Sequence, residues 1–124
     1  MKRDFDLIRE ILLAIESFEP ERISTLQSIS PTDFSGTAAQ NLHHITMLID
    51  AGLIDKVTHD LTPTFQVRGL TMAGHDFLDA IRDQTVWDKT KDQLKQAGGW
   101  TFDIVLAVAK EELKRRLGLG AQEL

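Results

Sequence analysis

The chain has 124 residues, which suits one domain with its own hydrophobic core, and its lack of cysteine excludes disulfides, cysteine-ligated zinc and thiol nucleophiles. The net charge of −5 weighs against nucleic-acid binding, because proteins that bind nucleic acids generally present a basic face to the phosphates. No apolar run forms a secretory signal or approaches the ~20 residues that span a bilayer, so we expect a cytoplasmic protein.

A first helix is expected from Phe5 to about Phe18, with Asp4 as its N-cap and Pro20 preventing its continuation. The apolar residues of this helix recur at three- and four-residue spacing and form one stripe. Residues 20–36 are rich in Ser, Thr, Pro and Gly. Two interpretations of this segment stay open: a short helix that would be the second of a helix-turn-helix, or a short strand followed by a loop.

The next helix is expected over residues 37–51, starting at Ser35, Gly36 or Thr37, and Gly52 suits its left-handed C-terminal cap. Successive side chains on a helix are about 100° apart, which assigns each residue to a face. The inner face is expected to carry Ala38, Leu42, Ile45 and Ile49, with Leu48 at its edge. The outer face is expected to carry Gln40, His43, His44, Met47 and Asp50.

Residues 53–71 are β-prone and are interrupted by turn residues at 60–63, which predicts a hairpin. Thr71 is expected to cap a further helix. A polar helix is expected after Thr85, and a last helix is expected after Thr101.

The order of a helix, the segment 51–54 (AGLI), a hairpin and a helix that opens with Leu-Thr-x-x-Gly is typical of the reading helix and wing of a winged helix-turn-helix. The predicted fold class is therefore mainly α with a small β-hairpin (α+β): a winged helix-turn-helix with additional C-terminal helices. We expect a single domain over residues 1–124, with a winged-helix core at 1–83 and a helical extension at 84–124.

Several motifs extend over most of the chain. It opens with Met-Lys-Arg-Asp, and residues 74–119 form a second characteristic block. A central pattern HxxLLxxAGL is met at His44, Leu48, Ala51, Gly52 and Leu53, with Met47 in place of the first Leu. A later RDxTVW motif is met at Arg82, Asp83, Thr85, Val86 and Trp87. With these motifs the chain resembles a family of small bacterial and prophage-associated proteins of unknown function. The resemblance implies a winged-helix fold and an origin in bacteria or their phages, and it implies no activity.

Helix 37–51 is the candidate reading helix. Side chains that both donate and accept hydrogen bonds can read base edges, and Gln or Asn paired with adenine is a favoured geometry. The candidate base-contacting residues are Thr37, Gln40, Asn41, His43 and His44. Lys56 and Arg68, at or beside the hairpin, are the candidate phosphate contacts. We therefore expect a DNA-binding or transcription-regulatory protein whose partner is double-stranded DNA.

A protein-interaction module is the alternative. The acidic balance and the lack of Lys and Arg in helix 37–51 favour it. In this interpretation the winged helix is a scaffold, and the C-terminal helices dock another protein or a second copy to form a dimer. Trp87 and Trp100 are then interface residues instead of core residues, and Leu106, Leu113 and Leu117 offer a second seam. A phage accessory protein that inhibits a host factor is a third possibility, which no residue selects.

Catalytic and metal sites are not expected. The chain lacks the GxSxG, P-loop and GxGxxG motifs, so we expect no enzyme and no cofactor. The adjacent His43 and His44 point about 100° apart on a helix and cannot easily share one metal ion. Neither HxxxH nor HExxH spacing occurs, so we expect no metal site.

Overall fold

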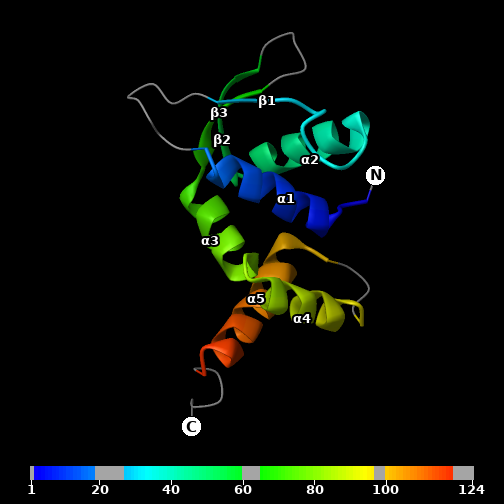
Figure 1. Cartoon of the computed structure of the whole chain (residues 1–124), viewed down its shortest axis with the longest axis vertical. Helices are drawn as coiled ribbons and strands as arrows, with labels where there is room; N and C mark the ends of the chain where they lie inside the picture. The colour runs from blue at the N-terminus through cyan, green and yellow to red at the C-terminus, as the bar shows by residue number, and fades with distance from the viewer. Residues whose placement is uncertain (1, 19–26, 60–64, 97–99, 119–124) are drawn as a thin grey trace. The chain divides into compact units, whose positions relative to one another are not determined.

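The structure is a computed structural model that describes residues 2–18, 27–59, 65–96 and 100–118. In chain order its elements are α1 (Phe5–Glu16), β1 (Gln27–Ile29), α2 (Ala38–Asp50), β2 (Ile54–His59), β3 (Phe65–Leu70), α3 (Met72–Ile81), α4 (Gln84–Leu94) and α5 (Phe102–Arg116) (Figure 1). This arrangement confirms the predicted mainly α-helical class with a small β component. No described helix has the length and apolar character needed to cross a membrane.

The contacts within the chain divide it into two compact units, residues 1–76 and 77–124. The division falls inside α3, whereas the sequence-based boundary at residue 83 lies after this helix. Each unit has its own set of buried apolar side chains.

The first unit contains a three-stranded antiparallel sheet in the order β1-β3-β2. β2 and β3 form the predicted hairpin, and its expected turn at 60–63 lies outside the described residues. β1 pairs with the other edge of β3, where Ile29 lies opposite Phe65 and both side chains are buried. In the described part of 20–36, from residue 27 onward, the chain is therefore a short strand followed by a loop, and no helix occurs there.

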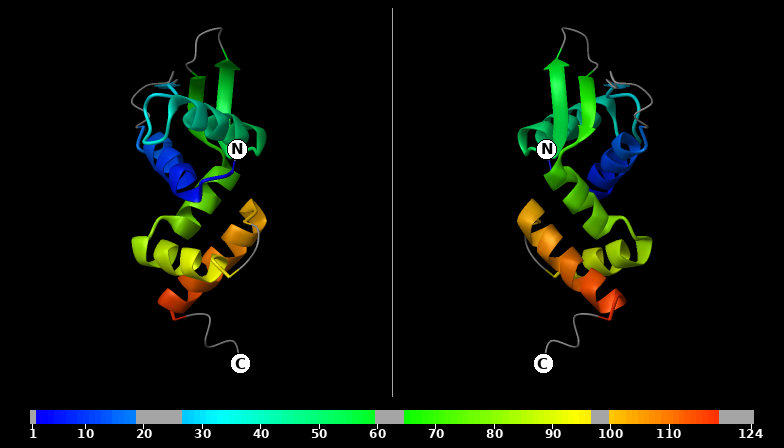
Figure 2. Two further views of the ribbon diagram at one scale, coloured as in Figure 1. Left: turned by 90° about the vertical axis from the view of Figure 1, so that its right-hand side faces the viewer. Right: turned by 90° about the vertical axis from the view of Figure 1, so that its left-hand side faces the viewer.

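The helices α1 and α2 pack against this sheet. α1 contacts both α2 and β3, and α2 contacts β2. The two views of Figure 2 place α2 on one face of the β2–β3 hairpin. The predicted apolar stripe of α1 is buried in this arrangement: Phe5, Ile8, Ile11, Leu12 and Ile15. Burial of this stripe supplies much of the apolar area that stabilises the unit.

Local hydrogen bonds place the helix ends in the first unit. Asp4 is the N-cap of α1, as predicted, because its carboxylate accepts from the N–H groups of Asp6 and Leu7. Gly52, with a φ of 78°, follows α2 in the left-handed conformation expected of it. Thr71 Oγ1 accepts from the N–H of Gly74 at 3.0 Å, which confirms Thr71 as the predicted cap of α3.

The second unit contains the end of α3 together with α4 and α5, and the last two helices pack against each other. α4 begins at Gln84 with Asp83 as its N-cap, slightly before the start predicted after Thr85. α5 begins directly after its N-cap Thr101, as predicted. Asp83 accepts from the N–H of Val86 at 2.9 Å, so the first turn of α4 is closed by its own flanking residue.

Both tryptophans contribute to the fold of the second unit. Trp87 is 1% exposed and is a core residue. Trp100 is half-buried, and its indole N–H donates to the carbonyl oxygen of Leu94 at 2.8 Å. Trp100 therefore ties the chain ahead of α5 to the end of α4.

Candidate functional site

The face of α2 that turns toward the core differs from the predicted one. The buried residues of α2 are Asn41, His44, Ile45 and Leu48. Leu42, expected inside, is 41% exposed, and His44, expected outside, is 1% exposed. The helix is therefore rotated relative to the purely hydrophobic assignment. This orientation of α2 is stable because the two buried polar side chains, Asn41 and His44, have hydrogen-bond partners inside the fold.

His44, on α2, is hydrogen-bonded to the start of α1. Its Nε2 accepts a hydrogen bond from the backbone N–H of Asp4 at 2.8 Å, and its Nδ1 lies 2.7 Å from the carbonyl oxygen of Gln40. Because a backbone N–H can only donate, Nε2 is the acceptor, and Nδ1 carries the proton that it donates to Gln40. A ring bonded on both nitrogens and buried in this way has no atom left for a base edge. The expected DNA contact of His44 is therefore replaced by a structural one.

Asn41 holds the loop that precedes α2. Its Nδ2 donates to the carbonyl oxygens of Pro31 at 2.6 Å, Phe34 at 3.1 Å and Gly36 at 3.0 Å. Its Oδ1 is buried and has no hydrogen-bond partner among the described residues. The side chain is 0% exposed. As with His44, the expected base contact of Asn41 is corrected, because its amide nitrogen is bonded inside the fold and the whole side chain is buried.

Thr37 and Gln40 lie at the exposed start of α2 and bond each other. Thr37 Oγ1 accepts from the N–H of Gln40 at 3.1 Å, and Gln40 Oε1 accepts from the N–H of Thr37 at 2.9 Å. This reciprocal capping box occupies both side-chain oxygens. The amide nitrogen of Gln40 takes no part in this capping box, and His43 is exposed one turn further along.

The two candidate phosphate contacts lie on the hairpin. Arg68 on β3 forms an ion pair with Asp55 on β2, with 3.8 Å between Nη1 and Oδ2, and the two side chains are 62% and 45% exposed. Lys56 on β2 is exposed and lines a small pocket of about 180 Å³ together with Asp50 of α2. Each cation therefore has a carboxylate near it or paired with it, which weakens its attraction for a phosphate.

The exposed side of α2, here called the α2 face, is neutral and partly apolar. Its exposed residues are Ala38, Ala39, Gln40, Leu42, His43, Thr46 and Asp50. They include one carboxylate and no Lys or Arg. The whole of residues 1–76 carries six basic and eleven acidic residues, a net charge of −5, so the surrounding unit does not supply the missing positive charge.

No metal centre is formed by the described residues, which contain no group of three potential ligands close together.

Comparison with known proteins places the chain in a family. Residues 2–100 match the family described as "Hypothetical protein (DUF2513)". The chain belongs to this family. It is also 35% identical over 121 residues to a protein of Haemophilus influenzae (strain ATCC 51907 / DSM 11121 / KW20 / Rd) described as "Uncharacterized protein", which covers 94% of this chain and 99% of that protein. No solved structure matches the chain.

The expected membership in a family of unknown function is thus confirmed. Neither the description of the DUF2513 family nor that of the Haemophilus protein names an activity.

Proposed function

We propose that residues 1–76 of this DUF2513 protein form a non-enzymatic winged-helix module that binds another protein through the α2 face and the adjacent hairpin. The order of a helix, a first strand, α2 and a two-stranded hairpin, with the first strand paired to the far edge of β3, supports the winged-helix assignment. The observation that carries the choice of partner is the neutral, partly apolar α2 face, on which Leu42 is 41% exposed.

A protein partner fits this face better than a nucleic acid does. Phosphate neutralisation supplies essentially all of the non-specific affinity for DNA, and each contact contributes about 0.9 to the slope of log K against log salt. Lys56 and Arg68 together would give a slope of only about 2. A protein surface, in contrast, gains from burying exposed aliphatic groups such as Leu42, and interface cores are depleted in charge.

Duplex DNA is the second candidate, and the chain topology favours it. In winged helices a helix in the position of α2 enters the major groove. Gln40 and His43 are exposed on this helix, and Lys56 and Arg68 lie on the neighbouring hairpin. In this case Gln40 and His43 contact base edges while the two cations hold phosphates.

Photo-crosslinking in cells of the source organism tests whether the α2 face contacts another protein. A photoreactive amino acid at His43 lies on the α2 face, and one at Thr32 lies at an exposed position of the same unit, off that face. We expect a discrete protein adduct from position 43 and none from position 32. Leu42→Glu should abolish the adduct without unfolding the unit, because Leu42 is exposed. Equal adducts from both positions would contradict the proposal.

Selection from a random duplex pool at ~0.15 M salt tests the second candidate. We expect no enriched motif and no retention of bulk DNA at ~0.05 M salt. An enriched motif that is lost on charge reversal of Arg68 would replace the protein partner with DNA.

A further inference from the structure

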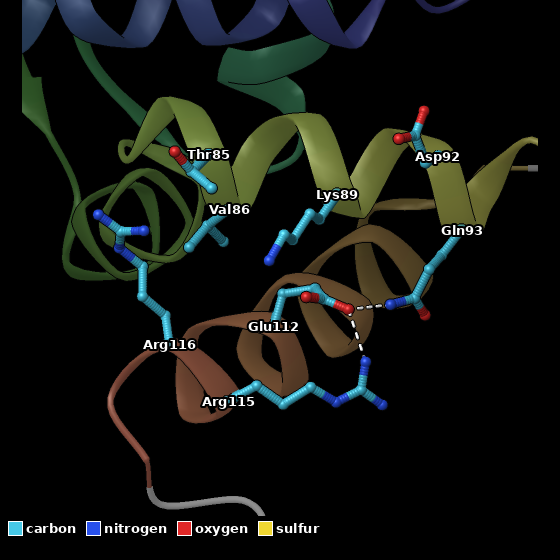
Figure 3. A pocket seen from close by; sticks show the side chains of 8 residues that line it. All are labelled: Thr85, Val86, Lys89, Asp92, Gln93, Glu112, Arg115 and Arg116. Atoms are coloured by element: carbon cyan, nitrogen blue, oxygen red, sulfur yellow. Dashed lines mark hydrogen bonds and ion pairs between the residues drawn. The ribbon is translucent and has the colours of Figure 1, made fainter.

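The second unit contains a pocket of about 620 Å³ between α4 and α5. α4 contributes residues at successive turns of one face, and α5 contributes residues from its last two turns, as Figure 3 shows. The lining residues are Thr85, Val86, Lys89, Asp92, Gln93, Glu112, Arg115 and Arg116. This volume lies in the range of about 300–1,000 Å³ typical of small-ligand sites.

The carboxylates of this pocket are already matched by cations. Glu112 is 5% exposed, and its Oε1 accepts from Arg115 Nη1 at 2.7 Å and from Gln93 Nε2. Asp92 lies 3.3 Å from Nζ of Lys95, which does not line the pocket. Neither carboxylate is therefore left to neutralise a further positive charge.

One cation of the pocket remains uncompensated. Lys89 extends from α4 into the space above Glu112 (Figure 3), and it makes no hydrogen bond or ion pair with any described residue. Arg116, on the other side, pairs with Asp83 through Nε at 3.4 Å and is half exposed. The pocket thus has an excess of positive charge with Lys89 at its centre.

The guanidinium of Arg115 is held in place before any ligand arrives. Glu112 is buried and bonded by both Arg115 and Gln93, so the contact anchors Nη1 of the guanidinium while the Arg115 side chain stays 61% exposed. A guanidinium with a free edge offers paired donors that match the oxygens of a phosphate or carboxylate. Preorganisation of this kind lowers the entropy lost on binding.

We propose that the α4–α5 pocket binds the phosphate group of a small organic phosphate. Lys89 supplies a compact positive charge, and Arg115 supplies directional donors from the opposite helix. A phosphate monoester fits better than a carboxylate, because its three oxygens can accept hydrogen bonds from Lys89 and from the unbonded nitrogens of Arg115 together. The site lies within the second unit and is independent of the α2 face.

Titration of the full-length chain, followed by amide NMR signals, tests the pocket. The probes are inorganic phosphate and adenosine monophosphate, with adenosine as the uncharged control and sodium chloride at matched ionic strength. We expect both phosphates to shift the same amides of α4 and the end of α5, with a Kd for inorganic phosphate of about 1 mM. Adenosine and chloride should leave these amides unchanged.

Two charge-matched variants assign the binding to the pocket. Lys89→Gln should weaken phosphate binding at least about tenfold, as expected for the loss of a charge-assisted hydrogen bond. Lys110→Gln removes the same charge from an exposed position on α5 outside the pocket and should leave the Kd unchanged. Thermal unfolding of both variants at the wild-type temperature confirms their fold. Equal weakening by both variants, an unchanged Kd in Lys89→Gln, or shifts reproduced by chloride or adenosine would overturn the proposal.

Discussion

Replacing Asn41 with Asp tests whether one buried amide holds the loop at residues 31–36 on α2. The two hydrogens of Asn41 Nδ2 serve the carbonyl oxygens of Pro31, Phe34 and Gly36, at 2.6, 3.1 and 3.0 Å. Aspartate has the same size but, when ionised, presents only acceptors to these three carbonyls. The substitution therefore turns attraction into repulsion without opening a cavity.

The cost follows from the number of hydrogens involved. Two hydrogens are shared among three carbonyl acceptors, so the variant loses the equivalent of two hydrogen bonds. Each buried polar group left without a partner costs about 1–3 kcal/mol, so the loss of two hydrogen bonds gives a destabilisation of about 2–6 kcal/mol. Protonation of the new carboxyl restores one hydrogen-bond donor, which keeps the destabilisation near the lower end of this range. Even that loss is a large share of the ~5–15 kcal/mol that stabilises a domain.

Urea unfolding should be followed by two probes, because the chain has two units. Both tryptophans lie in residues 77–124, so their fluorescence reports on the second unit, whereas the amide NMR signals of α1 and α2 report on the first. We expect the α1 and α2 signals of Asn41→Asp to be lost at lower urea. Gln66→Glu is the matched control, because its amide donates only to exposed Ser28, and it should cost under about 1 kcal/mol. If Asn41→Asp lay within about 0.5 kcal/mol of wild type, the anchoring role would be refuted.

Three further substitutions test contacts in the first unit by the same unfolding measurement. Gly74→Ala should cost about 1–3 kcal/mol or more, since a Cβ there would overlap the carbonyl oxygen of Leu53; a wild-type midpoint would show that α3 has room to move. His44→Leu should cost about 1–3 kcal/mol, because the bond from the N–H of Asp4 is lost, and the amide of Asp4 should exchange faster with solvent. Thr37→Ala should cost about 1 kcal/mol through loss of the cap, and a restored midpoint in Thr37→Ser would confirm that the hydroxyl is responsible.

Local signals in the sequence were enough to predict the helices and the β2–β3 hairpin, whereas β1 was only one of two open interpretations of residues 20–36. Asp4, Thr71 and Thr101 each accept a hydrogen bond from an N–H two or three residues ahead, so each marks a helix start without reference to the rest of the chain. Gly52 marks the end of α2 for a similar reason, since its positive φ is a local requirement. The mainly α-helical class and the hairpin follow from these signals.

The lack of positive charge on α2 could also be predicted from the sequence. The scarcity of cations in α2 is a property of its composition, and it already weakened the prediction of DNA binding. The pocket of the second unit was not predicted, because Lys89 and Arg115 are distant in sequence and converge only when α4 packs on α5. The three neighbouring cations at residues 114–116 were visible only as a complement to the helix dipole.

The sequence by itself therefore determined where α1, α3 and α5 begin, that a hairpin lies between α2 and α3, and that α2 would lack positive charge. Only the tertiary structure decided which side of α2 faces inward. Hydrophobic periodicity favours Leu42 as a core residue, but Asn41 and His44 are buried instead. Their hydrogen-bond partners, Pro31 and Asp4, lie 10 and 40 residues away in the chain, and only the fold brings them close. A helical wheel contains no information about such partners, and a buried polar group is stable only where they exist.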